Sequence, residues 1–272
     1  MTAFRWIEGA SGEVVADGKR LEAVAYGPPP DEAPTIVMLH EGLGCVALWR
    51  DFPARLAAAT GWGVFAYSRA GYGRSDPVAL PRPLDYMTRE ACSSLPIVLE
   101  AIRLKRGILL GHSDGASIAA IYAGEAFAGR VDGLVLIAPH VFTEEAGLAS
   151  IAEARRAYET GDLKPRLAKY HADVDVAFRG WNGAWLDPSF KAWNIEDAVQ
   201  RWRVPALLVQ GVDDPYGTLA QIRAIEARSP APVRSVILDR CRHSPHTEQP
   251  QATLDAIVRF CAKVAVSGRG SF

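Results

Sequence analysis

Six short apolar runs recur along the chain and alternate with longer stretches of helical character. The runs end at turn residues and occupy positions 35–40, 62–68, 107–113, 133–139, 206–211 and 234–239. Helices are predicted between and after them, at 49–60, 88–104, 115–128, 217–228 and 250–264. Buried strands that alternate with crossover helices predict an α/β fold with a mostly parallel sheet, and the first 30 residues are expected to add an antiparallel start to it.

Residues 139–203 break this alternation. The segment contains no convincing strand, is rich in Ala, charged residues and Trp, and includes helix-period runs such as LASIAEARRAYETG. An insertion of roughly 65 residues between two buried strands indicates a helical cap over the carboxyl ends of the strands, where open α/β sheets bind ligands. We therefore predict a core domain at 1–138 and 204–272 and a helical cap (lid) at 139–203.

Composition narrows the classes of function. The 272 residues carry 30 basic and 31 acidic side chains, which gives a formal net charge of −1. Such a chain lacks the excess of basic residues typical of nucleic-acid or acidic-membrane binding, so neither partner is expected. No stretch approaches the length of a membrane span, and the first residues do not resemble a signal peptide. A cytoplasmic monomer or homodimer that acts on a small molecule is the expectation.

The segment ILLGHSDGAS, at 108–117, carries the strongest chemical signal. Ser113 follows an apolar run, precedes a good helix and is flanked by Gly111 and Gly115. A sharp strand-to-helix turn would hold the serine in a strained conformation, raise its Oγ above the sheet and bring neighbouring backbone close to both glycines. The backbone N–H of Asp114 would then be free to bind an oxyanion at a helix N-terminus. The alternative is a helix-capping serine in an ordinary turn.

A serine nucleophile needs a base and a group that orients the base. Two acids, Asp213 and Asp214, follow the apolar run at 206–211, and His243 follows the run at 234–239. The order Ser, Asp, His along the chain is the one associated with nucleophile turns on α/β sheets. The sequence therefore predicts a catalytic triad.

Several segments resemble the α/β-hydrolase superfamily, in its capped esterase, lipase and C–C hydrolase branch. The resemblance extends from VMLHEGLGCVALW to HSPHTEQPQATLDAIVRF. It implies an α/β-hydrolase fold and a turn after the 35–40 strand that begins at His40, with Trp49 nine residues later. Glu41 stands where the family usually has Gly, and Gly42 is then similar to the residue whose backbone N–H is the second oxyanion donor.

The resemblance also indicates which acid and which histidine belong to the predicted triad. Asp214 lies three residues after Gly211, the spacing that similar hydrolases use, with Asp213 as the alternative. His243 aligns with the family's base, and His246 is the alternative. The turn SRAGYGRS, at 68–75, is similar to a family turn with two replacements and is interpreted as scaffold.

A metal site is the alternative interpretation of one cluster of side chains. Cys241, His243, His246 and Glu248 lie close together in the sequence. Pro245 interrupts them, so they lack the helical i, i+4 presentation of zinc peptidases. We expect neither a metal nor a cofactor.

The predicted activity is hydrolysis of a small to medium apolar carboxylic ester, lactone or thioester through an acyl-enzyme. C–C or amide hydrolysis would use the same triad, and a ligand-binding fold member with little turnover is a third alternative. Six large rings of the predicted cap would either line the pocket or form the core of the cap: Tyr170, Phe178, Trp181, Trp185, Phe190 and Trp193. For His140, a position facing the pocket and a position on the surface are equally compatible with the sequence.

Overall fold

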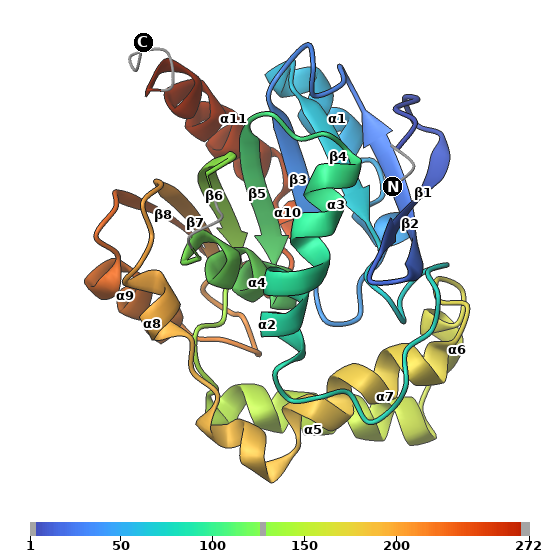
Figure 1. The fold of residues 1–272 in the computed structure, drawn as a ribbon. Coiled ribbons are helices and arrows are strands. Elements are labelled where there is room, and N and C mark those ends of the chain that lie inside the picture. Colours follow the sequence, from blue (N-terminus) through green and yellow to red (C-terminus); the bar gives the residue numbers. More distant parts are fainter. Residues whose placement is uncertain (1–3, 126–128, 268–272) are drawn as a thin grey trace.

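The predicted α/β fold is confirmed by the computed structural model, which describes residues 4–125 and 129–267 (Figure 1). The described chain forms one eight-stranded sheet in the order β1-β2-β4-β3-β5-β6-β7-β8. The strands are β1 Ser11–Ala16, β2 Lys19–Tyr26, β3 Thr35–Leu39, β4 Gly63–Tyr67, β5 Gly107–His112, β6 Val131–Ile137, β7 Ala206–Gly211 and β8 Val233–Leu238. β2 pairs antiparallel with both β1 and β4, and the other pairs are parallel. The expected antiparallel start is therefore present.

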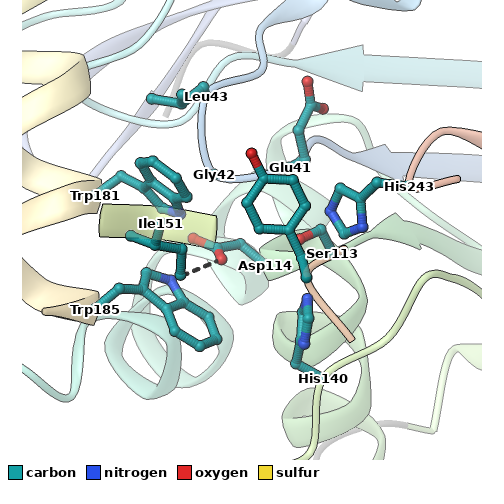
Figure 2. Close-up of a pocket in the computed structure, with 11 residues that line it drawn as sticks. Glu41, Gly42, Leu43, Ser113, Asp114, His140, Ile151, Trp181, Trp185 and His243 are labelled. Carbon is teal, nitrogen blue, oxygen red and sulfur yellow. Dashed lines mark hydrogen bonds between the residues drawn. The ribbon is translucent and has the colours of Figure 1, made fainter. Parts of the chain in front are cut away.

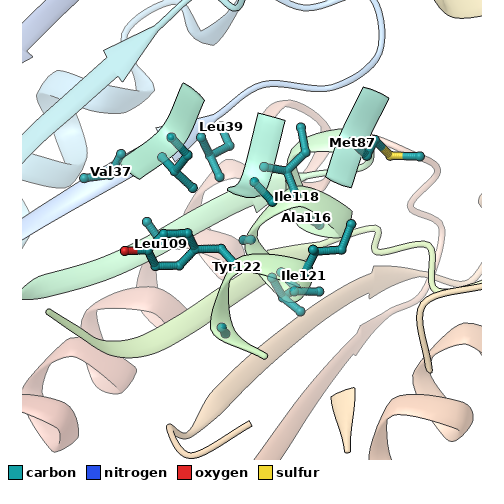
Figure 3. Packing of buried hydrophobic residues seen from close by; sticks show 14 of the residues in the cluster. Val37, Leu39, Met87, Leu109, Ala116, Ile118, Ile121 and Tyr122 are labelled. Carbon is teal, nitrogen blue, oxygen red and sulfur yellow. The ribbon is translucent and has the colours of Figure 1, made fainter. Parts of the chain in front are cut away.

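Helices cover both faces of the sheet. They are α1 Phe52–Thr60, α2 Tyr86–Arg89, α3 Leu95–Ala101, α4 Asp114–Ala123, α9 Leu219–Arg228, α10 Pro245–Glu248 and α11 Pro250–Ser267. Alternate residues of β3 enter two separate apolar clusters: Val37 and Leu39 join the one that contains α3 and α4, and Ile36 and Met38 join the one that contains α1 and α11. Figure 3 shows the first cluster around α4. Because both faces are buried, the central strands read as continuous apolar runs.

The helix predicted at 88–104 is present, but it is not a regular α-helix along its whole length. The structure has α2, then a π-helical turn at Glu90–Ser94, then α3, which ends at Ala101. Pro96 has no N–H to donate to the preceding turn, which explains why the regular hydrogen-bond ladder is interrupted at this point. The helix predicted at 115–128 begins at Asp114, and its last positions, 126–128, lie outside the described residues.

The segment 139–203, called the helical insertion from here on, leaves the sheet after β6 and returns before β7. It contains α5 Glu145–Thr160, α6 Leu163–Leu167, α7 Val174–Trp185, a 3₁₀ turn at Pro188–Ala192 and α8 Glu196–Val199. In Figure 1, α5, α6 and α7 lie beyond the carboxyl ends of the central strands, whereas α8 packs against α4 and α9. The division into core and cap domains stays a proposal. Within the part of the chain that the structure describes, no helix is long and apolar enough to span a membrane.

Candidate active site

Ser113 occupies the turn between β5 and α4 with φ of 53° and ψ of −117°. A non-glycine residue with positive φ outside the helical wells costs on the order of 1–3 kcal/mol, so the surrounding structure must impose this conformation. A Cβ at Gly111 would lie 2.2 Å from the Gly115 carbonyl oxygen, and one at Gly115 would lie 2.0 Å from that of Leu39. The close approach predicted from the glycine spacing is therefore present.

His243, in the loop after β8, contacts the carboxylate of Asp214. Its Nδ1 lies 2.8 Å from Oδ2 and 2.9 Å from Oδ1 of Asp214. The same carboxylate accepts hydrogen bonds from the backbone N–H of Tyr216 and the side-chain amide of Gln210. Burial opposes ionisation of Asp214, but the hydrogen bond and charge of His243 lower its pKa to about 2. An ionised Asp214 requires the proton of a neutral His243 to be on Nδ1, which leaves Nε2 as an acceptor.

The structure distinguishes between the paired alternatives of the sequence. Asp213 is exposed, and its backbone N–H donates to the Cys241 carbonyl, whereas the Asp214 side chain is 1% exposed behind His243. His246 packs between Trp49 and His112, with ring centroids 4.9 Å from each, and does not line the pocket described below.

A second pair of acidic and imidazole groups supports the backbone of His243. The Nε2–H of His112 donates to the His243 carbonyl oxygen over 2.7 Å. On the other side of the ring, Nδ1 of His112 lies 3.4 Å from Oε2 of Glu41. Burial opposes the charge on Glu41, but its attraction to the neighbouring His112 holds the pKa of Glu41 below the ordinary value. Glu41, the family departure noted in the sequence, thus points away from Ser113 and toward His112 (Figure 2).

These groups border a small cavity beneath the helical insertion. Its volume is about 100 Å³, and it is lined by Glu41, Gly42, Leu43, Ser113, Asp114, His140, Ile151, Trp181, Trp185, Tyr216 and His243 (Figure 2). Loops at the carboxyl edge of the sheet supply the polar wall, and α5 and α7 supply Ile151 and the two tryptophans. Asp214 is not among the lining residues, since it lies behind His243.

Gly42 and Asp114, whose backbone N–H groups are the predicted oxyanion donors, both line this cavity. Within residues 4–125 and 129–267, neither N–H donates a hydrogen bond to another group. The turn that carries Gly42 is held by the buried guanidinium of Arg69, which donates to the carbonyl oxygens of His40 and Glu41. A Cβ at Gly42 would lie 2.1 Å from Nε1 of Trp181, so only glycine fits beneath the indole.

The Asp114 carboxylate turns away from Ser113 and connects the turn to the helical insertion. It accepts a 2.5 Å hydrogen bond from the Tyr86 hydroxyl and a 3.1 Å bond from the indole N–H of Trp185. Burial raises the pKa of Asp114, and the positive charge of Arg69 acts in the opposite direction. Asp114, which lines the pocket beside Ser113, therefore also fixes one of the pocket's aromatic walls.

The aromatic rings of the helical insertion fall into those that line the cavity and those that lie elsewhere. Trp181 and Trp185 line the cavity, whereas Phe178 and Phe190 are buried in the apolar cluster and Tyr170 is 38% exposed. Sequence reasoning did not single out Leu43, Ile151 and Tyr216 as lining residues. For Tyr216, its place two residues after Asp214 was an available signal. Among the described residues, no group of three or more His, Cys, Asp or Glu side chains is arranged to hold a metal ion.

Comparison with known proteins identifies the family. The model of the alpha/beta hydrolase family matches residues 36–256, so the chain belongs to that family. It is a hydrolase-fold protein whose relatives include enzymes of different named activities.

Three similar proteins illustrate this range. Epoxide hydrolase B of Mycobacterium tuberculosis is 32% identical over 106 residues, which are 39% of this chain and 29% of that protein. The match thus spans less than a third of the length of that curated relative. The non-heme chloroperoxidase of Streptomyces lividans is 27% identical over 241 residues, covering 75% of this chain and 83% of that protein. The crystal structure of VinJ superposes with a TM-score of 0.76 at 20% identity, covering 95% of this chain and 100% of VinJ, which supports the fold alone.

Proposed function

We propose that this protein is a serine hydrolase that cleaves a carboxylic ester of a small substrate through an acyl-enzyme. The observation that carries the proposal is the pairing of His243 with Asp214 at a cavity that also contains the strained Ser113. A hydroxyl becomes a useful nucleophile when an imidazole with a free acceptor nitrogen can take its proton.

The proposed reaction uses only side chains and backbone groups at the cavity. Nε2 of His243 removes the proton from Oγ of Ser113 as Oγ forms a bond to the substrate carbonyl carbon. The electron pair of the C=O bond moves to the oxygen, which the N–H groups of Gly42 and Asp114 stabilise. The oxyanion then re-forms the C=O bond as the C–O bond to the alcohol breaks, and the alcohol oxygen takes the proton from Nε2, which leaves the acyl-enzyme. Water repeats the sequence on the acyl-enzyme and releases the acid and free Ser113.

The size of the cavity limits the substrate. A dry protein cavity of about 150 Å³ accommodates benzene. The cavity beside Ser113, at about 100 Å³, is smaller and is bordered by Leu43, Ile151, Trp181 and Trp185. We therefore propose a short acyl group, in an ester, lactone or thioester. A cytoplasmic location and a monomeric or homodimeric state stay predictions of the sequence.

Fluorophosphonate labelling tests this proposal. The wild-type protein should be labelled on Ser113, and Ser113→Ala should not, because an activated serine hydroxyl displaces fluoride from the probe and becomes phosphonylated. Ser117→Ala is a matched control: Ser117 lies one helical turn away, and its Oγ donates to the His140 carbonyl. Equal labelling of wild type and Ser113→Ala would refute a serine nucleophile at this position.

A substrate panel separates ester cleavage from the related reactions that the same groups could perform. p-Nitrophenyl acetate should be hydrolysed faster than its long-chain homologues, since the cavity is small. Turnover of a vinylogous diketone or an anilide, without turnover of any ester, would show that the scissile bond is C–C or C–N instead.

A further inference from the structure

We propose that His140 forms a hydrogen-bonding subsite for a hydroxyl group beside the scissile carbonyl, so that esters of short 2-hydroxy acids are the preferred substrate class. This inference rests on the proposed esterase function and adds to it the chemistry of the acyl group. Its starting point is a buried polar ring whose hydrogen-bonding capacity is unused.

His140 lacks a partner for its imidazole. The residue is 4% exposed, and among residues 4–125 and 129–267 neither ring nitrogen takes part in a hydrogen bond. Its neighbours are rings: the centroid of Trp185 lies 5.4 Å away in an edge-on arrangement, and that of His243 lies 5.8 Å away. Buried polar side chains in native proteins are usually paired, so an unpaired one at a cavity indicates a ligand contact.

The surrounding backbone directs the ring. The carbonyl oxygen of His140 accepts a 2.7 Å hydrogen bond from Oγ of Ser117, which anchors the residue at the end of β6. Gly217 covers one edge of the ring, because a Cβ there would lie 2.9 Å from Cε1 and 3.1 Å from Nδ1. The ring points toward Ser113 in Figure 2, so its far nitrogen, Nε2, faces the cavity.

The charge around the ring selects the kind of group that it can bind. Burial lowers the pKa of His140 to about 4, so the imidazole is neutral near pH 7 and offers one N–H donor and one lone pair. No Lys or Arg is among the described residues that line the cavity. A carboxylate or phosphate on the substrate would therefore have no cationic partner there. A hydroxyl, which both donates and accepts, matches a neutral imidazole.

The position of the subsite follows from the small volume. In a cavity of about 100 Å³, a group that fills the space beside Ser113 lies within a few bonds of the carbon that Ser113 attacks. The leaving alcohol must approach Nε2 of His243 to take up its proton. Since His140 packs against Trp185, on the wall formed by the helical insertion, we place its partner on the acyl side of the ester.

Two esters that differ by one hydroxyl test this inference. Hydrolysis of methyl lactate, as each enantiomer, and of methyl propionate is followed by titrating the released acid. Wild type should hydrolyse one enantiomer of methyl lactate with a kcat/KM about tenfold higher than that for methyl propionate, which is the ratio expected for one buried hydrogen bond. His140→Leu should abolish that preference, and His140→Gln, whose amide nitrogen can replace Nε2, should retain part of it. Ile151→Val is the matched control, because Ile151 lines the same cavity without a polar atom.

The outcomes separate the subsite from the esterase function. Loss of the preference in His140→Leu alone supports the subsite. Equal rates on both esters in wild type, or equal losses on both esters in His140→Leu, overturn it. Ethyl acetate and 2-hydroxyethyl acetate extend the test to the alcohol side, where a preference that depends on His140 would also overturn the assignment to the acyl group. If wild type hydrolyses none of these esters and Ser113 resists fluorophosphonate, the proposed function itself fails. The labelling rate of each variant reports whether it is folded.

Discussion

The loop after β8 and the loop after β6 each present an imidazole to the same cavity, but only one imidazole has an acid behind it. His243, in the first loop, contacts the Asp214 carboxylate through Nδ1. His140, in the second, has Gly217 at the corresponding edge of its ring. Both rings lie within reach of one bound molecule, since their centroids are 5.8 Å apart.

This difference separates a proton-transfer group from a binding group. A carboxylate at Nδ1 fixes the tautomer of His243 and stabilises the imidazolium that forms when it accepts a proton. Burial, together with the charge of His243, lowers the pKa of His140 to about 4, which makes it a weak base near neutral pH. We therefore assign the role of each histidine from the group that contacts its Nδ1, and not from the position of the ring at the cavity alone.

Removing the acid should have the largest effect. We expect Asp214→Asn to lower kcat for p-nitrophenyl acetate by about 10⁴-fold, because the amide would hold the wrong tautomer of His243. Asp213→Asn is the matched control and should lower kcat less than about twofold, since Asp213 is exposed and its structural contact is made by the backbone. The reverse ranking would show that Asp213 is the acid.

Displacing an oxyanion donor should have the next largest effect. Gly42→Ala would force a methyl group into the indole of Trp181, so we expect kcat/KM to fall by about 10²- to 10³-fold. Gly183→Ala, on the same helix as Trp181, has no atom within 4 Å of the added carbon and serves as the control. Near-normal activity in Gly42→Ala would mean that this turn does not supply a donor.

The unpaired imidazole of His140 should change how the free energy of unfolding depends on pH below neutrality. The folded pKa of His140, about 4, lies below the unfolded value of 6.5, so the unfolded chain binds more protons between these values and stability falls as pH falls. When the pH is lowered from 7 to 4.5, the free energy of unfolding should decrease in both proteins. In urea titrations, we expect the decrease to be about 2 kcal/mol smaller for His140→Gln than for wild type. Parallel pH dependences of the two proteins would show that His140 is not held neutral by burial.

Weakening the contact between Glu41 and His112, whose ring supports the backbone of His243, should have the smallest effect. Glu41→Gln removes the charge that faces His112, and we expect kcat to fall by about fivefold with KM unchanged, because Glu41 acts on the position of the base and does not contact the substrate carbonyl. A change confined to KM would instead indicate that Glu41 binds substrate.

The sequence predicted the parts of this site that depend on local pattern. The apolar runs located the strands, and the paired glycines around Ser113 indicated a close approach that the backbone does show. The spacing from Gly211 favoured Asp214, the acid that contacts His243.

Other features depend on packing between distant segments, which periodicity does not encode. Phe178 and Trp181 lie one turn apart on α7, yet only Trp181 lines the cavity. The direction of Glu41 depends on His112, 71 positions away on β5, and the environment of His140 depends on Gly217 in another loop. Pro96 marks the place where the helix predicted at 88–104 departs from regular α-helical geometry.

Identification of the residue that carries the acyl group tests the central claim most directly. Wild-type protein is mixed with p-nitrophenyl acetate, quenched in acid within the first turnover and digested for mass spectrometry. We predict an acetyl group on the peptide that contains Ser113, localised to its Oγ and absent from Ser113→Ala. An acetyl group on any other side chain, or hydrolysis that continues undiminished in Ser113→Ala, would contradict the account.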